Sequence, residues 1–517
     1  MMKAESLEGL HKTHPSAWQR WLPLLSLVGV PLYLYANLFT FHNVPLLVLA
    51  DQTFFWEYAY RMLQGDRIYT DFFQFTPPGV DLTYFVLLKL LGPSLWVVNT
   101  GLILLGVAFF WTCFSVAHRI LSRNQALFTA AFIVVLIFGD RLDGTHHWFS
   151  LTLSLCAVRV VMTRRTPPRI LCAGALAGTA AFFTQTAGAA AVTALTLALC
   201  WECLAYRKSR RETLMQIMLL VTAFALEWIA LNAHFIATLG WQRFFYLQVT
   251  YPQLYVMNAH EFLFPDIRNE LHARAAPRLL RHFFVYFSLA IYPPTLWYCW
   301  RRRRAANSRT DMPIVVLAML GLLLMLEVIT RANWTRIYCV ASPALILLSW
   351  AILRFTGTSF RRFATIAAGC AIIFLAAIQI HGRQLQENKV IQLPAGNAAL
   401  DPMKWEEYTW VKGHTQPGDY IFQASWLDMY LPLALRNPVF AEDLLPNDRT
   451  RPEMVDQTVR QLEQKRVKYI VWSPQWSNSD HAEKPSYDHL VPLRNYLQSH
   501  YTRVHVFSNQ DEIWQRQ

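Results

Sequence analysis

The chain has 517 residues, of which 54% are apolar and only 16% are charged, against roughly a quarter charged in an average soluble domain. This composition excludes an ordinary soluble enzyme and indicates a protein that is solvated in part by lipid. The net charge of +13 would fit a nucleic-acid-binding protein if it formed one patch, but the basic residues fall in short clusters between apolar runs. That arrangement follows the positive-inside rule, so we expect no nucleic-acid partner.

About eleven apolar segments are predicted to span the membrane. The first follows a short basic leader and has no small-residue cleavage site after it, which indicates a retained signal anchor. When every basic cluster is placed in the cytoplasm, the N-terminus is cytoplasmic and the spans alternate without a forced step. The predicted spans are 21–40, 95–117, 125–139, 147–163, 170–184, 187–205, 214–238, 281–300, 312–330, 338–353 and 363–380. We therefore expect a multi-pass protein of the plasma (inner) membrane.

Three segments between spans are expected on the extracytoplasmic side, at 41–94, 139–147 and 241–281. Within the first, residues 51–65 have the apolar periodicity of an amphipathic helix that stops at a glycine. The apolar stretch 79–92 is too short to span, which favours an interfacial or re-entrant element. Binding and catalytic residues concentrate in loops that a rigid scaffold positions, so these segments are the first place to seek a site.

The last part of the chain has the composition of a soluble domain. Its pattern predicts helices at 403–414 and 452–466 and strands at 419–425, 468–474, 503–508 and 512–517. The predicted fold is thus a polytopic α-helical membrane domain over 1–382, followed by an extracytoplasmic soluble α/β domain over 383–517. This domain has no phosphate-binding glycine loop and no metal-ligand spacing, which favours a docking or acceptor-recognition role.

Asp51 is the first candidate site residue. It lies about ten residues after the first predicted span, at the start of the amphipathic helix. A carboxylate just outside the membrane can reach lipid headgroups at little energetic cost. The same position also suits a helix N-cap, and position alone does not separate the two roles.

The run that starts at Asp51 resembles the first outer loop of GT-C glycosyltransferases related to the aminoarabinose and protein-O-mannosyl transferases. Asp51 matches the acidic position of that loop, and Leu63 and Gly65 match the end of its aromatic helix. The proline element that closes the loop is matched by 76–79. The resemblance covers the whole chain in architecture, including the soluble C-terminal domain.

Two positions depart from the family pattern. The aminoarabinose branch usually has a lysine where Thr76 stands, and relatives often have a second lysine where Gln185 stands. These departures put the identity and placement of the phosphate-binding cation in question.

Two further matches lie later in the chain. In the second outer loop, Asp143 corresponds to an acidic residue of the family, with Asp140 as the rival, and Arg141, His146 and His147 lie beside it. The two histidines suit a phosphate or a metal, although interfacial histidines commonly hydrogen-bond water or headgroups.

The third match is the Arg-Tyr element that leads into a late span. Arg336 and Tyr338 occupy its positions, and Pro343 follows as in the family. A guanidinium suits a lipid phosphate because it binds phosphate in a bidentate way. An arginine at this depth also serves as an interfacial anchor.

The resemblance implies transfer of a sugar from a polyprenyl-phosphate-linked donor to a glycan, lipid or protein acceptor on the extracytoplasmic face. Asp51 would be the general base, with Asp143 as the second acidic residue. Arg336 and Tyr338, with Arg141 or a histidine, would stabilise the phosphate leaving group. One base without a covalent intermediate implies inversion at the anomeric carbon. The sequence requires no divalent metal and leaves any metal unknown.

Two other functions stay open from the sequence. A transporter or flippase for an envelope lipid or sugar has the same span count, and Glu227 and Glu327 within spans would favour it. A lipid-binding scaffold with a degenerate site would explain the absent lysines at Thr76 and Gln185.

Overall fold

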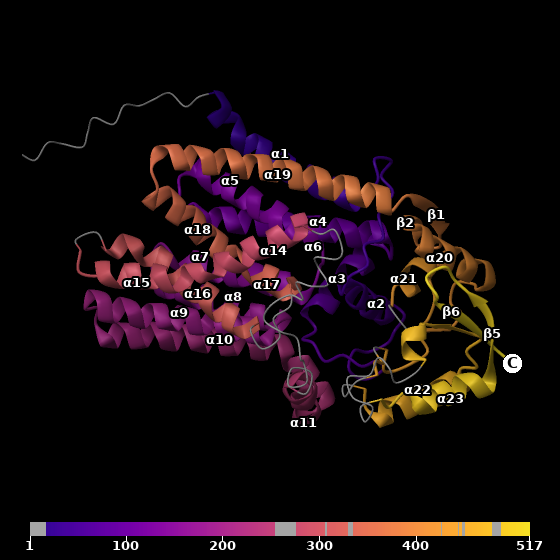
Figure 1. The fold of residues 1–517 in the computed structure, drawn as a ribbon. Helices are drawn as coiled ribbons and strands as arrows, with labels where there is room; N and C mark the ends of the chain where they lie inside the picture. The colour runs from indigo at the N-terminus through magenta and orange to yellow at the C-terminus, as the bar shows by residue number, and fades with distance from the viewer. Residues whose placement is uncertain are drawn as a thin grey trace, which may run out of the picture.

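The fold consists of a bundle of long helices joined to a smaller part built of helices and strands (Figure 1). The structure is a computed structural model, and it describes residues 17–253, 276–305, 308–328, 334–424, 427–442, 444–446, 450–477 and 488–517. Helices α2 (Gln52–Leu63) and α3 (Gly79–Leu91) lie between the bundle and the C-terminal part. The first predicted outer loop therefore forms the layer between the two parts.

Each predicted span coincides with a helix or with consecutive helical segments. These are α1 (Ala17–Leu38), α4 (Leu95–Ala117), α5 (Arg123–Ile133) with η2 (Val134–Phe138) and α6 (Gly139–Arg141), α7 (His146–Val161), α8 (Pro167–Phe183), α9 (Gln185–Tyr206), α10 (Arg210–Leu239), α14 (Ala276–Ser288) with η4 (Leu289–Ile291) and α15 (Tyr292–Arg302), α16 (Met312–Val328), α17 (Trp334–Val340) with α18 (Ser342–Phe355), and α19 (Thr358–Gln386). Among the described residues, 5 helices are long and apolar enough to cross a membrane: Leu95–Ala117, Arg123–Arg141, Gln185–Tyr206, Arg210–Leu239 and Thr358–Gln386. The chain is thus a membrane protein with several apolar helices, and the count of eleven spans stays a prediction.

Small residues bring helices of the bundle close together. A Cβ placed on Gly178 of α8 would lie 2.7 Å from the carbonyl oxygen of Phe224 on α10. A Cβ on Gly188 of α9 would collide with the backbone of Ala181 on α8. Membrane helices associate through such close backbone approach, because lipid supplies little hydrophobic drive between them. The small-residue run of the sequence therefore has a packing role.

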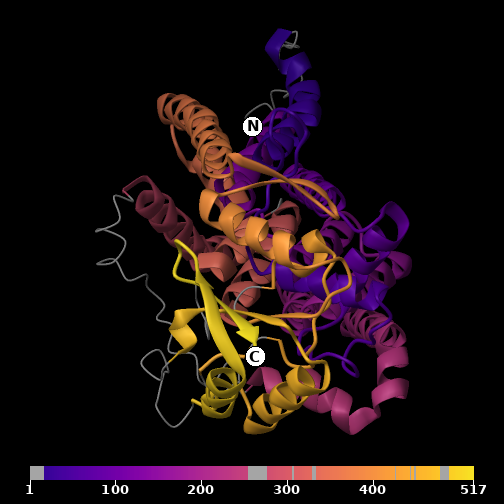
Figure 2. The same cartoon turned by 90° about the vertical axis from the view of Figure 1, so that its right-hand side faces the viewer.

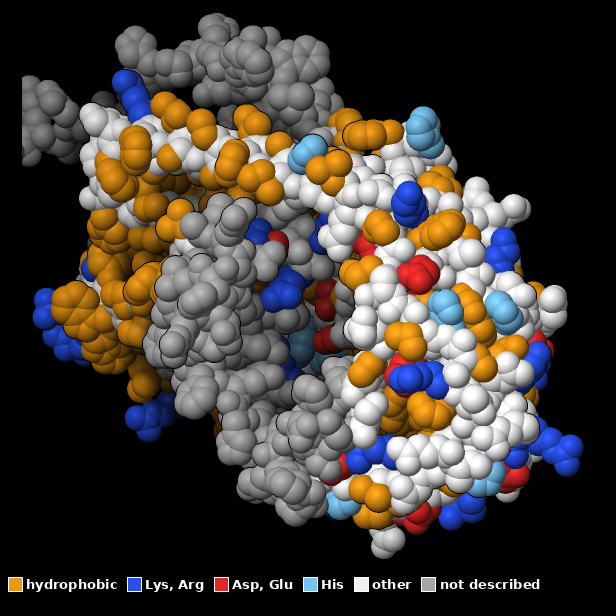
Figure 3. Space-filling model, turned by 45° about the vertical axis from the view of Figure 1, so that its right-hand side comes forward, with side chains coloured by type: hydrophobic (Ala, Val, Ile, Leu, Met, Phe, Trp, Pro, Cys, Tyr) orange, Lys and Arg blue, Asp and Glu red, His pale blue; other side chains and the backbone are white. Residues whose placement is uncertain are grey.

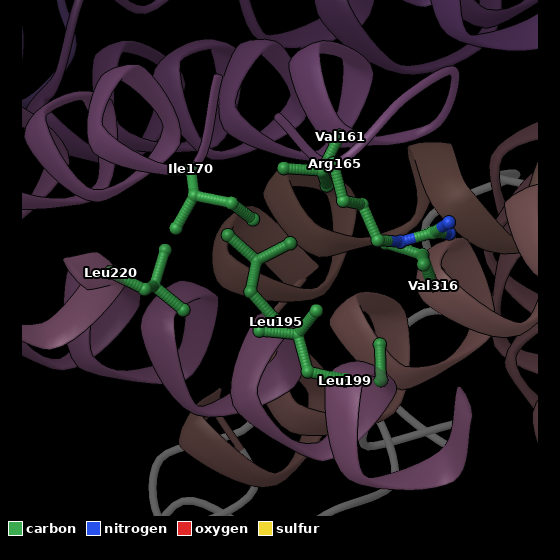
Figure 4. Close-up of a pocket in the computed structure, with 8 residues that line it drawn as sticks. Val161, Arg165, Ile170, Leu195, Leu199, Leu220 and Val316 are labelled. Carbon is green, nitrogen blue, oxygen red and sulfur yellow. The ribbon is translucent and has the colours of Figure 1, made fainter. Parts of the chain in front are cut away.

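A small cavity lies inside the bundle. It has a volume of about 10 Å³ and lies among apolar side chains that include Leu195, Leu199 and Leu220, with Arg165 at its edge (Figure 4). That volume is at the lower limit for a single water molecule. The cavity is a packing defect and offers no room for a substrate.

The C-terminal part contains a hairpin and a four-stranded sheet. The hairpin pairs β1 (Lys389–Leu393) with β2 (Gly396–Leu400), and the sheet has the order β3-β4-β6-β5, with β3 parallel to β4 and the other pairs antiparallel. Its remaining elements are β3 (Ile421–Gln423), β4 (Tyr469–Trp472), β5 (Tyr501–Val506), β6 (Glu512–Arg516), α20 (Pro402–His414), α21 (Tyr430–Leu433), α22 (Pro452–Gln464) and α23 (Val491–His500). Figure 2 faces this part and shows it covering one end of the bundle. The hairpin and α23 were not predicted from the sequence.

The first loop and the C-terminal part share one hydrophobic core. Trp56 and Tyr84 of the loop belong to the same buried cluster as Tyr408 and Tyr430. Backbone hydrogen bonds also join the two segments: the Leu47 amide donates to the Ala399 carbonyl at 2.9 Å. The helix α19 runs without interruption through residue 382, where the sequence suggested a domain boundary. The C-terminal part is therefore packed onto the bundle as one unit with the first loop.

This packing changes the environment of α2. Its sequence predicts an amphipathic helix with one polar face, yet residues around its whole circumference are buried, including Glu57 and Arg61. The polar face is covered because Arg61 binds Glu442 of the C-terminal part. The N-terminal end of this buried helix carries Asp51.

Candidate functional site

Asp143 lies against the beginning of α2. The Gln52 amide donates to the Asp143 carboxylate at 3.0 Å, and the Gly144 amide donates to the Gln52 side-chain oxygen at 3.0 Å. Asp143, Gly144 and Gln52 are all buried. The hydroxyl of Tyr84 on α3 donates to the Gly144 carbonyl at 3.3 Å. The first two predicted outer loops thus meet at residues 51 and 52.

The two carboxylates at this junction differ in environment. Burial raises the pKa of Asp143 well above its usual value, and the neighbouring charge of Asp51 raises it further, while the hydrogen bond from Gln52 opposes the shift. The Asp51 side chain is exposed and makes no hydrogen bond that caps α2. The Asp51 carboxylate therefore does not cap the N-terminus of α2. The pair consists of an exposed carboxylate beside a buried one that favours the protonated form.

Arg336 lies beside the two histidines that follow this junction. It interacts electrostatically with both His146 and His147, whose ring centroids are 4.0 Å apart. The ring of His146 also packs edge-on against Phe55 of α2. The charges of Asp143, Arg141, Glu327 and Arg336 all act on the buried thiol of Cys339, which places these four side chains in its surroundings.

Tyr338 faces a second group of polar side chains. It is fully buried, its hydroxyl is 2.7 Å from His282 Nδ1, and the Arg141 guanidinium lies 5.7 Å from the centre of its ring. Arg281 forms an ion pair with Asp140 at 2.7 Å. Asp140 is thereby neutralised by Arg281, whereas Asp143 is the carboxylate that lies beside Asp51.

Sequence reasoning missed Gln52, Arg281 and His282. The signal that could have found the last two is an Arg-His pair at the outer edge of the predicted span 281–300. No feature of the sequence marks Gln52 as a site residue. It contributes hydrogen bonds from its backbone amide and to its side-chain oxygen, and these form only when the first two loops meet.

Thr76 belongs to a different group of contacts. Its carbonyl accepts hydrogen bonds from Tyr69 at 2.9 Å and from the side chain of Gln248 at 3.4 Å. The side chain of Gln185 donates to the Gln248 side-chain oxygen at 2.8 Å. Thr76 and Gln185, the two positions that depart from the family's lysines, therefore share Gln248 as a neutral partner.

The two glutamates that would favour transport both accept hydrogen bonds from neighbouring helices. Glu227 of α10 accepts one from Thr179 of α8 at 3.2 Å. Glu327 of α16 accepts one from Thr186 of α9 at 2.7 Å. These contacts hold pairs of helices together, which is the structural role that such residues commonly have.

The surface is hollowed between the bundle and the C-terminal part, and basic, acidic and histidine side chains reach the surface together inside this hollow (Figure 3). Asp51 is exposed, and Arg141, His146 and His147 are half-buried, as a site open to solvent requires. No group of three or more metal-binding side chains occurs among the residues that the structure describes. The arrangement is suited to proton transfer by a carboxylate and to binding of an anion by guanidinium groups.

The fold is similar to those of solved GT-C membrane glycosyltransferases. ArnT from Cupriavidus metallidurans, solved with bound undecaprenyl phosphate, superposes with a TM-score of 0.58 at 13% identity over 96% of this chain and 97% of that chain. The oligosaccharyltransferase of Archaeoglobus fulgidus, solved with a tethered acceptor peptide, gives 0.54 at 12% identity over 97% of this chain and 74% of that chain. Neither a family model nor a curated protein sequence matches the chain. The resemblance noted in the sequence is confirmed at the level of the fold.

Proposed function

We propose that the protein is a membrane glycosyltransferase that moves a sugar from a polyprenyl-phosphate donor to an acceptor on the extracytoplasmic face. The observation that carries the proposal is the junction at which the Gln52 amide fixes the Asp143 carboxylate beside Asp51. The charge of Arg141 acts on Asp143, and that of Arg336 acts on His146 and His147, which follow Asp143 in the chain. The undecaprenyl phosphate bound to the ArnT neighbour supports a polyprenyl-phosphate donor.

In the proposed reaction, Asp51 removes the proton from the acceptor hydroxyl. The acceptor oxygen forms a bond to the anomeric carbon while the bond from that carbon to the phosphate oxygen breaks. The configuration at the anomeric carbon is thereby inverted. The electron pair of the broken bond stays on the phosphate, where Arg336 and Arg141 stabilise the added charge. A general base needs only one carboxylate within hydrogen-bond reach of its proton. Asp51 suits the role of general base better than Asp143, because an exposed carboxylate can be reached by an acceptor hydroxyl and a buried one cannot.

Asp143 and Tyr338 have positioning roles in this proposal. A protonated Asp143 does not compete with Asp51 for the acceptor proton, and its hydrogen bond from Gln52 fixes the residue that follows Asp51. The ring of Tyr338 lies under the Arg141 guanidinium, and a cation over an aromatic face is held in place. The acceptor is a glycan, lipid or protein, and the C-terminal part that borders the hollow is positioned to contact it.

The experiment that tests the proposal is Asp51→Asn in proteoliposomes supplied with a labelled polyprenyl-phosphate sugar. We expect transfer to fall by about 10²- to 10⁴-fold, the usual contribution of a general base. Asp71→Asn is the matched control, because Asp71 is an aspartate of the same loop whose partner is the exposed Arg67. Undiminished transfer by Asp51→Asn, with normal folding of both variants, would remove Asp51 from the mechanism.

A further inference from the structure

A second cavity, of about 330 Å³, lies at the opposite end of α2 from Asp51. We call it the α2–α10 cavity, because its walls come from the end of α2 and the turn after it, from α3, and from the last turns of α10. Since α2 has 12 residues and a helix rises 1.5 Å per residue, about 18 Å separates its two ends. The cavity is thus distinct from the site at Asp51.

The aromatic residues that follow α10 place this cavity at the height of the membrane surface. After its charged first turn, α10 contains a long apolar window that is largely exposed, as expected for a helix in contact with lipid. Directly after it, Trp241 is 56% exposed, and the rings of Phe245 and Tyr246 are exposed as well. Exposed aromatic rings of this kind gather at the level of lipid headgroups. An occupant of the cavity would therefore come from the headgroup region of the bilayer.

The walls of the cavity differ in chemistry. Leu82 and Phe85 of α3 form an apolar wall, and the turn after α2 contributes the carboxylate of Asp66 and the guanidinium of Arg67. His234 of α10 adds a third polar group. Each charge is already paired, Asp66 with Arg61 and Arg67 with Asp71, so the lining offers one acidic and one basic group without an uncompensated charge. This pattern fits a ligand that has an anionic group, a cationic group and an adjoining apolar stem.

Arg67 can bind an anion without losing its present partner. Its Nε donates to Asp71 at 3.1 Å, and its side chain is 70% exposed. A guanidinium carries five N–H donors, so one hydrogen bond to Asp71 leaves donors for a phosphate. Asp66 is partly exposed while it pairs with Arg61 at 2.8 Å, and its second oxygen can accept from an ammonium.

We propose that the α2–α10 cavity binds the headgroup of a zwitterionic, amine-bearing glycerophospholipid such as phosphatidylethanolamine. The phosphate lies at Arg67 and His234, the ammonium at Asp66, and the glycerol end along Leu82 and Phe85. The proposal depends on the position of α10 in the membrane and does not depend on the transferase activity. A lipid bound here would contact the last turn of the helix whose first turn follows Asp51, and would hold that helix at the membrane surface.

The test is native mass spectrometry of the full-length protein after exchange into nanodiscs that contain phosphatidylethanolamine, phosphatidylglycerol or polyprenyl phosphate. We expect selective retention of phosphatidylethanolamine by the wild type. Thr238→Trp fills the cavity and should lower retention of the lipid at least tenfold. Ala237→Trp, at the preceding position of α10, should leave retention unchanged, because Ala237 is exposed and does not line the cavity. Arg67→Gln should also lower retention, and Lys412→Gln, at an exposed position of α20 outside the lining, should not.

Three results would overturn the proposal: equal retention by Thr238→Trp and the wild type, preference for phosphatidylglycerol, or preference for polyprenyl phosphate. Arg67 is exposed, so Arg67→Gln keeps the test valid if the tryptophan variant fails to fold. Asp51→Asn should retain phosphatidylethanolamine as the wild type does. That variant separates the two proposals, because it tests transfer without altering the cavity.

Discussion

Replacing Arg61 with methionine should separate the first loop from the C-terminal part. Arg61 is only 3% exposed and forms a short ion pair with the Glu442 carboxylate. It also donates to Asp66 at 2.8 Å, to the Val439 carbonyl at 2.8 Å and to the Asp71 carbonyl at 3.3 Å. Removing one partner of a buried ion pair costs about 3–5 kcal/mol, because the other charge stays buried without compensation. We expect Arg61→Met to lose stability of that order.

The loss should depend on pH. Glu57 and Glu442 are both buried near Arg61. Burial raises the pKa of Glu57 and the Glu442 charge raises it further, while Arg61 lowers it. In Arg61→Met the pKa of Glu57 in the folded state should be higher than in the wild type. The free energy of unfolding of the variant should therefore fall further than that of the wild type as pH rises from the unfolded-state pKa of Glu57 toward its folded-state pKa. The destabilisation by Arg61→Met should therefore be largest at neutral and alkaline pH and should shrink as the solution is acidified.

The assay is thermal unfolding in detergent, combined with hydrogen exchange of α2 and α21 in the full-length protein. Arg67→Met is the control, because the Arg67–Asp71 pair has side chains that are 70% and 36% exposed. Such surface pairs contribute about 0–1 kcal/mol. If Arg61→Met and Arg67→Met unfold at the same temperature at pH 8, the buried cluster does not hold the two parts together and the reasoning is refuted.

Three further predictions concern local packing and charge. Gln52→Ala leaves the buried Gly144 amide without its acceptor, so chemical denaturation should show a loss of about 1–3 kcal/mol, and transfer should slow at unchanged donor KM. Gly188→Leu places a side chain against the backbone of Ala181, and a lower unfolding temperature should report the separation of α8 from α9. Burial raises the pKa of Glu407 to about 7, so its contribution to stability falls as pH rises from about 5 through 7. Glu407→Gln should flatten that dependence in the hydrogen exchange of α20; an unchanged profile would contradict it.

The helices of the bundle could be predicted from the sequence because apolar length and basic clusters act locally. The strands of the sheet could also be predicted from their local pattern; β4, for example, lies inside the predicted segment 468–474. The hairpin of β1 and β2 was not predicted although its own pairing is local, and the bonds of Ala399 to Pro45 and Leu47 could not be predicted because they join distant segments. Long-range pairing leaves little trace in a local pattern.

The candidate site was predictable only in part. Asp51 and Asp143 were found through a resemblance, and the structure brings them together. The burial of Glu57 and Arg61 was not predictable, since a helix with one polar face normally turns that face to water. It is covered by Glu442, which comes from the other end of the chain. The environment of a charged side chain depends on its distant partners, and a single sequence does not name them.

The hydrogen bond from Leu47 to Ala399 has a consequence for biosynthesis. The first loop leaves the ribosome about 350 residues before the segment that completes its backbone pairing. Until that segment has been made, the loop's apolar side chains, Trp56 among them, lack the cover that later buries them. Loss of the last quarter of the protein would leave this early loop unfinished, so a nonsense mutation near the 3′ end of the gene should expose the newly made chain to membrane quality-control proteases.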